Sequence, residues 1–310
     1  MKLGKIVRNA KILNAIKLGQ LYMQTVEKGT LYIVATPIGN LADISQRAID
    51  ILSQVDWIAA EDTRHSKKLL QHLMIQNRLV SLHDHNEKAR VDSLLQKLQA
   101  GESGALISDA GTPLISDPGY HLVRALREQG VEVRPIPGAS AMISALSVAG
   151  LATDRFSFEG FLPAKMQKRQ QTLQALIHEN RTMVFYESPH RLIESLSAML
   201  AVFGAERELF VAREMTKQFE QFIAGSLAEG LAFFQQNPDK VRGEFVLVLR
   251  GAPQEVVSEV TDWDALIQTL LAQSLPVKQI ADIVAQYYGV KKNAVYPRVL
   301  ALKAMSETSD

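Results

Sequence analysis

The fold class is decided by the segment Ser108-Asp109-Ala110-Gly111-Thr112-Pro113-Leu114-Ile115-Ser116-Asp117-Pro118-Gly119. It follows a short apolar run, residues 104–107, that predicts a buried strand, and it precedes a helical pattern at residues 121–129. Glycine and proline form tight turns and leave backbone amides free to bind a ligand. In open α/β sheets, ligands bind in loops that follow parallel strands. An ordinary strand-to-helix connection also needs turn residues. A twelve-residue loop made mostly of glycine, proline, aspartate and hydroxyl residues nevertheless favours a binding site.

Strands and helices alternate along the first half of the chain. The runs that predict strands cover residues 30–36, 57–60, 79–82, 104–107 and 131–136. A helical pattern follows each run, the first at residues 43–53, and the connections are short. This alternation predicts a parallel sheet with helices on both faces. Polar or glycine-rich clusters follow all of these strands, so we expect them to meet at one edge of the sheet, where the carboxyl ends lie.

A second α/β unit follows a linker at residues 150–155. Its predicted strands cover residues 156–162, 182–186, 208–213, 218–224 and 244–250. The strand at residues 218–224 has alternating polarity and follows its predecessor closely, which predicts some antiparallel pairing. A polar, acidic linker at residues 253–262 ends this unit.

Three helical patterns close the chain, at residues 263–272, 277–288 and 291–304. Gly289 lies where a helix-turn-helix has its turn, whereas Pro297 argues against an uninterrupted last helix. A small capping bundle and a nucleic-acid-binding module are both compatible with this pattern. The sequence therefore predicts four parts: an N-terminal extension (1–28), two α/β domains (29–150 and 151–252), and a linker with a helical tail (253–310).

The composition excludes several classes of protein. The chain has 310 residues, of which 47% are hydrophobic, and a formal net charge of +1. It can therefore bury a large core, and any surface for nucleic acid must be a local patch. The absence of cysteine excludes disulfides and cysteine nucleophiles and fits a reducing compartment. No apolar run is long enough to span a membrane. The G-x-G-x-x-G, P-loop, G-x-S-x-G and H-E-x-x-H motifs are absent, which disfavours a dinucleotide site.

The first 28 residues differ from the rest of the chain. They carry six lysines and arginines against a single acid, Glu27. Because lysines interrupt every apolar stretch, a signal peptide is disfavoured. A basic helix on a membrane surface is one interpretation. We favour a disordered extension or a mis-annotated start upstream of Met23.

Seven motifs resemble one protein family closely. They are Thr36-Pro37-Ile38-Gly39-Asn40-Leu41, Glu61-Asp62-Thr63-Arg64-His65, His83-Asp84-His85-Asn86-Glu87, residues 108–119, Pro137-Gly138-Ala139-Ser140, Phe185-Tyr186-Glu187-Ser188-Pro189-His190-Arg191 and Arg213-Glu214-Met215-Thr216-Lys217. From about residue 29 onward, the chain is similar to the RsmI-type ribosomal RNA methyltransferases. The resemblance implies two α/β domains of tetrapyrrole-methylase type, with a cofactor cleft between them, and a small C-terminal helical domain.

The resemblance also implies a reaction and its cofactor. S-adenosylmethionine would donate a methyl group to the ribose 2′-hydroxyl of a decoding-centre cytidine, cytidine 1402 of 16S rRNA. The implied partners are 16S rRNA or the small ribosomal subunit and a second copy of the chain in a homodimer. We expect a cytoplasmic enzyme without a membrane partner, and the motifs assign no metal-binding residues.

The resemblance assigns cofactor binding to specific positions. These are Pro37, Gly39, Asp109, Gly111, Thr112, Pro113, Ser116, Ser140, Ala141, Glu187, Ala212 and Glu244. Thr112 stands where the wider fold has an aspartate. A charged contact to the methyl donor is therefore expected from elsewhere, with Asp109 as the candidate.

A ribose hydroxyl is a weak acid, so its methylation calls for a base. The candidates are Glu61, Asp62, His83, His85 and Glu187, and their spacing singles out none of them. The candidates for contacts to RNA phosphates are Arg64, Lys165, Arg169 and Arg191. The two histidines also flank Asp84 in a pattern that can bind a metal, but histidines at a strand end are more often hydrogen-bonded loop residues. Two alternatives stay open: a tetrapyrrole methylase of the same fold, and a non-catalytic nucleic-acid-binding regulator.

Overall fold

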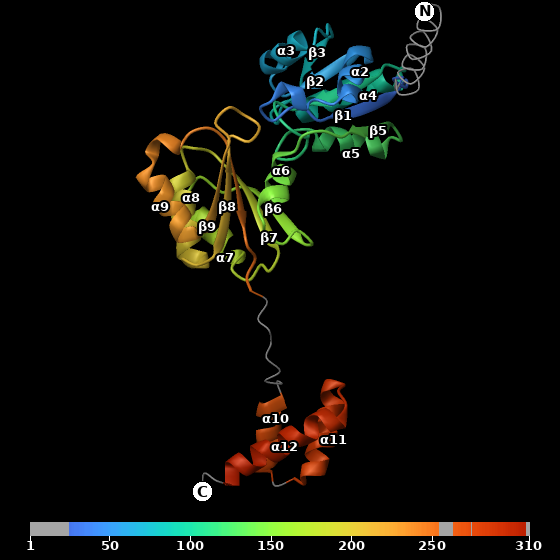
Figure 1. Ribbon diagram of the computed structural model, residues 1–310. Helices are drawn as coiled ribbons and strands as arrows, with labels where there is room; N and C mark the ends of the chain where they lie inside the picture. The colour runs from blue at the N-terminus through green and yellow to red at the C-terminus, as the bar shows by residue number, and fades with distance from the viewer. Residues whose placement is uncertain (1–24, 254–262, 274, 308–310) are drawn as a thin grey trace, which may run out of the picture. The chain divides into compact units, whose positions relative to one another are not determined.

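The computed structural model describes residues 25–253, 263–273 and 275–307, and Figure 1 shows their arrangement into helices and strands. The chain divides into two compact units, Met1–Ala252 and Pro253–Asp310. The first unit contains two five-stranded sheets. Residues 1–24 of the predicted extension lie outside the described residues. Near its end, Glu27 forms an ion pair of 2.5 Å with Arg134.

The first sheet is wholly parallel, as the sequence predicts. Its strands are β1 (Thr30–Val34), β2 (Trp57–Ala60), β3 (Leu79–Ser81), β4 (Gly104–Ile107) and β5 (Glu132–Ile136). They lie in the order β3-β2-β4-β1-β5. Because all five strands run in one direction, the loops that follow them emerge at one edge of the sheet.

Helices cover both faces of this sheet. They are α2 (Gln46–Gln54), α3 (Thr63–His72), α4 (Glu87–Gln99) and α5 (Tyr120–Glu128), and α6 (Ala141–Val148) follows β5. One face packs against α2 and α3 through Ile51, Leu52 and Leu70. The other packs against α4 and α5 through Leu94, Leu98 and Leu122. Burial on both faces explains why the strands are almost continuously apolar.

The second sheet is mixed. Its strands are β6 (Phe156–Phe161), β7 (Thr182–Glu187), β8 (Glu208–Arg213), β9 (Gln221–Ser226) and β10 (Phe245–Leu249). They lie in the order β6-β7-β10-β8-β9. Only β6 and β7 are parallel, and the other three pairings are antiparallel. The predicted antiparallel pairing of the strand after β8 is thereby confirmed.

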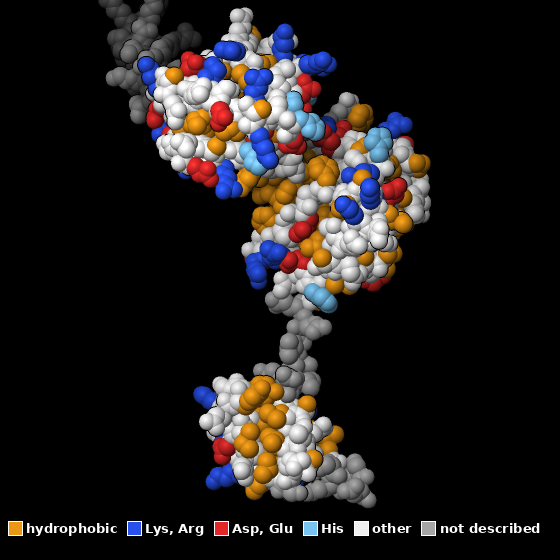
Figure 2. Space-filling model, turned by 180° about the vertical axis from the view of Figure 1, so that it is seen from behind, with side chains coloured by type: hydrophobic (Ala, Val, Ile, Leu, Met, Phe, Trp, Pro, Cys, Tyr) orange, Lys and Arg blue, Asp and Glu red, His pale blue; other side chains and the backbone are white. Residues whose placement is uncertain are grey.

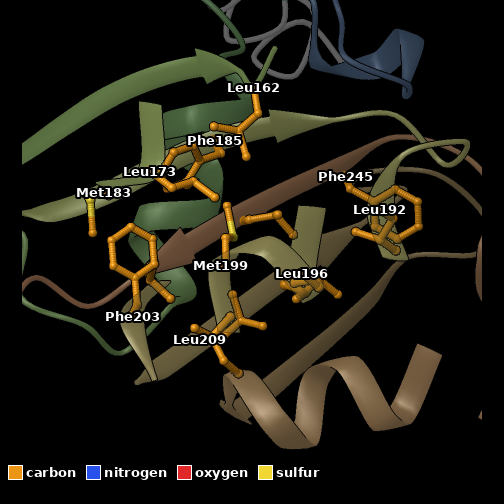
Figure 3. Packing of buried hydrophobic residues seen from close by; sticks show 14 of the residues in the cluster. Leu162, Leu173, Met183, Phe185, Leu192, Leu196, Met199, Phe203, Leu209 and Phe245 are labelled. Atoms are coloured by element: carbon orange, nitrogen blue, oxygen red, sulfur yellow. The ribbon is translucent and has the colours of Figure 1, made fainter. Parts of the chain in front are cut away.

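The two faces of the second sheet have different partners. Helices α7 (Met166–Ala175), α8 (Leu192–Phe203) and α9 (Leu227–Gln236) bury one face. Figure 3 shows Phe185, Leu196 and Met199 in the resulting core. Helix α6, which follows the first sheet, packs against the other face through Ala145 and Leu146. This helix therefore joins the two sheets, and the site described below lies beside its N-terminus.

Two predicted element boundaries are wrong for local reasons. The helix predicted at residues 43–53 is a 3-10 turn, Leu41–Asp43, followed by α2. Ser45 starts α2 because its side chain accepts a hydrogen bond of 3.1 Å from the amide of Ala48. The strand predicted from residue 218 starts at Gln221 instead, because the preceding residues form a turn with Thr216 at φ 65°.

The described residues of the second unit form three helices, α10 (Trp263–Ala272), α11 (Val277–Tyr288) and α12 (Lys292–Glu307). Their core includes Ile267, Val284 and Val299. Gly289 ends α11 in the left-handed conformation, φ 66°, which glycine adopts without strain. Contrary to our expectation, α12 continues through Pro297. Proline lies in the second turn there, so the helix loses a single amide donor near its start.

In the parts of the chain that the structure describes, every helix is too short or too polar to cross a membrane.

Candidate active site

Hydrogen bonds join three of the loops at the carboxyl edge of the first sheet. Thr36, after β1, exchanges two backbone hydrogen bonds of 2.8 and 3.0 Å with Gly111, after β4. The hydroxyl of Thr112 donates to the carbonyl of Ala139, after β5, over 3.1 Å. Each loop therefore holds its neighbour, which gives a ligand a preorganised surface.

The loop at residues 108–119 contains backbone conformations that are rare for residues with a side chain. Leu114 and Ser116 have φ values of 73° and 67°, and Gly111 and Gly119 have 81° and 131°. At Gly119 a Cβ atom would lie 2.7 Å from Leu106 Cδ2. Such strain is retained where the surrounding structure enforces it, and it is common at functional sites.

A cavity of about 410 Å³ lies between this loop and the second sheet. From the first sheet, residues 109–112, 115–117 and 140–141 line it, together with Ile38 and Glu61. From the second sheet, residues 186–189 and 243–246 line it, together with Phe161. Its volume lies within the roughly 300–1,000 Å³ typical of small-molecule sites. The two sheets thus supply opposite walls of one binding site.

Direct contacts between the two sheets' loops close this cleft. The amide of Asn40 donates a hydrogen bond of 3.1 Å to the Thr216 hydroxyl. The amide of Met142 donates one of 3.2 Å to the Tyr186 hydroxyl. At Gly39 a Cβ atom would lie 2.5 Å from Lys217 Cγ, so only glycine permits this approach.

Carboxylates crowd the first-sheet wall of the cavity. Burial raises the pKa of Glu61 to about 7, and repulsion from Asp117, Asp109 and Asp84 adds to the shift. Burial also raises the pKa of Asp117 to about 6, against the opposing effect of a hydrogen bond with Ser108. Glu61 can therefore exchange a proton near neutral pH, and the acidic wall suits a positively charged ligand.

Glu187 lies at the end of β7 and is 2% exposed. Its carboxylate accepts hydrogen bonds from the Ser195 hydroxyl (2.5 Å) and the Ser188 amide (2.9 Å). Arg191 Nε lies 3.6 Å from the same carboxylate. These contacts fix the loop that carries Ser188 and Pro189 into the cavity wall.

A second cavity, of about 540 Å³, adjoins the first. Ile38, Asp109, Ala110 and Glu244 line both. The remaining wall of the second cavity comes from Thr36, Pro37, Gly39 and Leu41, from α3 and from Lys217. Lys217 Nζ lies 2.6 Å from Glu214 Oε1 and 3.0 Å from Glu244 Oε2.

The structure distributes the predicted cofactor residues over several places. Those that line the first cavity are Asp109, Gly111, Thr112, Ser116, Ser140, Ala141, Glu187 and Glu244. Pro37 and Gly39 line the second cavity instead. Pro113 lines neither cavity, and Ala212 is buried in the core against the second sheet. Strand position alone does not tell a core side chain from one at the surface of the cleft.

Of the predicted catalytic residues, Glu61 and Glu187 reach the first cavity. Asp62 instead caps α3, where it accepts a hydrogen bond of 2.8 Å from the Arg64 amide that lowers its pKa. His83 and His85 line neither cavity, and their rings lie 5.9 Å apart in an edge-to-face contact. They belong to the turn that starts α4. Among the described residues, no group of three potential ligands could hold a metal ion.

The four residues predicted to contact RNA phosphates also differ in their exposure to solvent. Arg64 and Lys165 are exposed. Arg169 is 2% exposed and donates to the carbonyls of Pro163 and Ala164, which gives it a structural role in this loop. Arg191 is also turned inward, toward Glu187 and the carbonyl of Leu162. An arginine near a helix start can donate hydrogen bonds to backbone carbonyls or extend into solvent. The sequence does not distinguish these two arrangements.

Several lining residues were missed by sequence reasoning. Asp117 was named only as part of a turn, and Tyr186 only as part of a motif. Phe158 and Phe161 contact the Tyr186 ring edge-on, with ring centres 4.8 and 5.7 Å away. The alternating aromatic residues of β6 were the available signal for this apolar part of the second-sheet wall.

Comparison with known proteins identifies the class to which this fold and cleft belong. The family model for tetrapyrrole (corrin/porphyrin) methylases matches residues 30–230. A second model, the RsmI C-terminal HTH domain, matches residues 258–303. The solved structure of the methyltransferase CobJ is 18% identical and has a TM-score of 0.54, over 72% of this chain and 95% of that one. The fold and cleft are those of a methyltransferase of the tetrapyrrole-methylase class.

Two relatives are much closer in sequence. Ribosomal RNA small subunit methyltransferase I of Escherichia coli O157:H7 is 52% identical over 88% of this chain and 95% of its own. The protein of the same name from Pasteurella multocida (strain Pm70) is 51% identical over 86% of this chain and 95% of its own. The chain therefore belongs to the ribosomal RNA small subunit methyltransferase I family.

Proposed function

We propose that the protein transfers a methyl group from S-adenosylmethionine to the ribose 2′-hydroxyl of a cytidine in the 16S rRNA of the small ribosomal subunit. The observation that carries this proposal is the cavity of about 410 Å³, which combines an acidic wall with a carboxyl group of pKa about 7, Glu61. The two relatives described above, named for small-subunit ribosomal RNA, support the substrate class. The target implied by the motifs is the decoding-centre cytidine 1402.

The residues of the first cavity fit S-adenosylmethionine. Ile38, Ile115 and Phe161 offer apolar surface for an adenine ring. The carboxylates of Asp109 and Asp117 can attract a sulfonium and an ammonium group. Gly111, with φ 81°, brings backbone rather than a side chain to the cavity surface. The cofactor supplies an electrophilic methyl carbon on a positively charged sulfur.

The chain's own groups can position the acceptor and take its proton. Glu61 accepts the proton of the ribose hydroxyl as the oxygen–carbon bond forms and the carbon–sulfur bond breaks. Its raised pKa suits this role, because a base with a pKa near the working pH is most effective. Asp109 Oδ1 accepts a hydrogen bond of 3.2 Å from the Asp62 amide, which links the loops after β2 and β4 and fixes Glu61 beside the cavity. Aligned reactants supply much of the remaining acceleration.

A homodimer is the second part of the proposal. The apolar side chains Ile143, Val148, Phe156 and Phe161 are each at least about one-third exposed, and they lie on α6 and β6. Figure 2 shows hydrophobic side chains gathered beside the cleft. Such patches commonly mark protein interfaces. Sedimentation of the purified chain should give the mass of two copies. A monomer at micromolar concentration would refute the proposed homodimer.

Two experiments test the proposed activity. S-adenosylmethionine should raise the melting temperature of the purified protein, whereas a purely nucleic-acid-binding regulator would not respond. In cells that lack the gene, nucleoside mass spectrometry of 16S rRNA should show loss of one 2′-O-methylcytidine. An unchanged methylation pattern would refute the proposed substrate. A substrate in the small subunit also implies that the enzyme works in the cytoplasm.

A further inference from the structure

The second cavity combines apolar and cationic surface with two carboxylates, Asp109 and Glu244, that it shares with the first. Ile38, Leu41 and Leu69 give it an apolar side. His65 and Lys68 give it a polar, cationic side, and Lys217 closes it toward the second sheet. Lys217 is already paired with Glu214 and Glu244, so the charge that the cavity offers to a ligand comes from α3.

The cationic side is set by the geometry of α3. His65 and Lys68 are three residues apart, so they project from the same side of the helix. Lys67 is also exposed but does not line the cavity. In Figure 2, lysine, arginine and histidine side chains lie on the first-sheet part beside the cleft. In this cavity a planar apolar group could pack against the apolar side, and an adjacent anion could bind the cationic side.

We propose that the second cavity holds the acceptor nucleotide, with its base against Ile38, Leu41 and Leu69 and its phosphate at Lys68 and His65. This inference rests on the proposed function, and it assigns the RNA-binding side of the same site. The size of the cavity suits one nucleotide taken out of its stack, as enzymes that modify single nucleotides require.

The wall shared by the two cavities explains how donor and acceptor meet. Asp109 and Ala110 line both cavities, and so does Ile38. A nucleotide in the second cavity therefore brings its ribose to the edge of the first, where Glu61 lies. Asp109 and Glu244 also line the second cavity, so the phosphate is placed at Lys68 and His65 on α3, where the lysine charge is opposite to its own.

The test compares Lys68→Ala with Lys67→Ala in the full-length protein. Both remove one exposed lysine from α3, and only the first changes the cavity. Methylation of small ribosomal subunits from cells lacking the gene is measured against subunit concentration, and binding of S-adenosylmethionine is measured by calorimetry. Lys68→Ala should raise the KM for subunits about tenfold, as expected for a lost phosphate contact. Its affinity for S-adenosylmethionine should equal that of the wild type.

The remaining variants separate this inference from the proposed function. Lys68→Arg should restore a KM close to that of the wild type, because it keeps the positive charge. Equal KM values for Lys68→Ala and Lys67→Ala would overturn the assignment of the second cavity. If the wild type does not methylate subunits at all, the proposed function itself fails, which is a different result. A weaker affinity of Lys68→Ala for S-adenosylmethionine would place the cofactor, not the nucleotide, at Lys68.

Discussion

The amide of Met142 donates a hydrogen bond of 3.2 Å to the hydroxyl of Tyr186. Met142 lies in the first turn of α6, where backbone amides have no partner within the helix. Tyr186 lies on β7 of the second sheet and lines the first cavity. This bond thus satisfies one of the free amides at the N-terminus of α6 and links the two cavity walls.

Tyr186→Phe should weaken the binding of S-adenosylmethionine about fivefold, since a hydrogen bond of this kind contributes about 1 kcal/mol. Calorimetric titration measures the change. Tyr32→Phe is the matched control, because the Tyr32 hydroxyl also accepts a backbone hydrogen bond, from Glu27 over 3.0 Å, but lies outside both cavities. Equal affinities for the two variants would show that the bond does not organise the cofactor site.

Glu61→Gln should lower kcat by about 100-fold or more, the usual contribution of a general base, while cofactor affinity changes little. In the wild type, kcat should rise with pH through about 7, because only the ionised carboxylate accepts a proton. Asp62→Asn is the control: it changes a neighbouring acid that caps α3 and does not line the first cavity. A flat pH profile in the wild type would exclude Glu61 as the base.

The same carboxyl group should make stability depend on pH. Folding raises the pKa of Glu61 from 4.5 to about 7. Its contribution to stability is therefore present below pH 4.5 and is lost as the pH rises through about 7. Glu61→Gln should be more stable than the wild type at pH 8, by about 1 kcal/mol after solvent screening, and equally stable near pH 4. Urea denaturation at both pH values measures this, and a constant difference would contradict it.

Arg169→Ala should destabilise the protein by about 2–3 kcal/mol, because it removes a buried side chain and its hydrogen bonds to the carbonyls of Pro163 and Ala164. Lys168→Ala, at the exposed neighbouring position, should change stability by less than about 0.5 kcal/mol. Thermal unfolding of both variants tests the structural role. A fully stable Arg169→Ala with reduced RNA affinity would contradict the structural role and support an RNA contact instead.

Glu87 has a structural role, although it belongs to the motif His83-Asp84-His85-Asn86-Glu87, which supplies two of the predicted catalytic residues. It is 4% exposed, and its Oε1 accepts a hydrogen bond of 3.0 Å from the Leu122 amide at the start of α5. Gly119, which precedes α5, has no side chain to cap the helix. Glu87→Ala should therefore cost about 1–2 kcal/mol in chemical denaturation, whereas Lys88→Ala should be nearly neutral. Equal effects would exclude this cap.

Much of the fold was predictable, because its signals are local. The run Trp57-Ile58-Ala59-Ala60 and the turn-rich loop at residues 108–119 predict a parallel strand and a ligand-binding edge, and both are present. Side chain capping by Ser45 moved a helix start by a few residues, which the apolar pattern does not reveal. Whether α12 can include Pro297 depends on the residue at which the helix begins. The sequence does not determine that residue to better than a few positions.

The site was less predictable, because its geometry comes from contacts between distant segments. Nothing near Tyr186 in the sequence indicates Met142 as its partner, and Glu61 is distinguished from Asp62 only by the direction of its side chain at the end of β2. Arg169 illustrates the same difficulty. A helix start rich in lysine and arginine predicts solvent-exposed side chains, but the Arg169 side chain is buried. The second cavity needs segments around Gly39, Lys68 and Lys217 to meet.

The central claim is tested most directly with the purified protein, deuterated-methyl S-adenosylmethionine and small ribosomal subunits from cells that lack the gene. Nucleoside mass spectrometry follows digestion of the 16S rRNA. We expect one trideuterated 2′-O-methylcytidine per subunit, absent when Glu61→Gln replaces the wild type over the same reaction time. A label found on a base, on another nucleoside, or nowhere in the rRNA would contradict it.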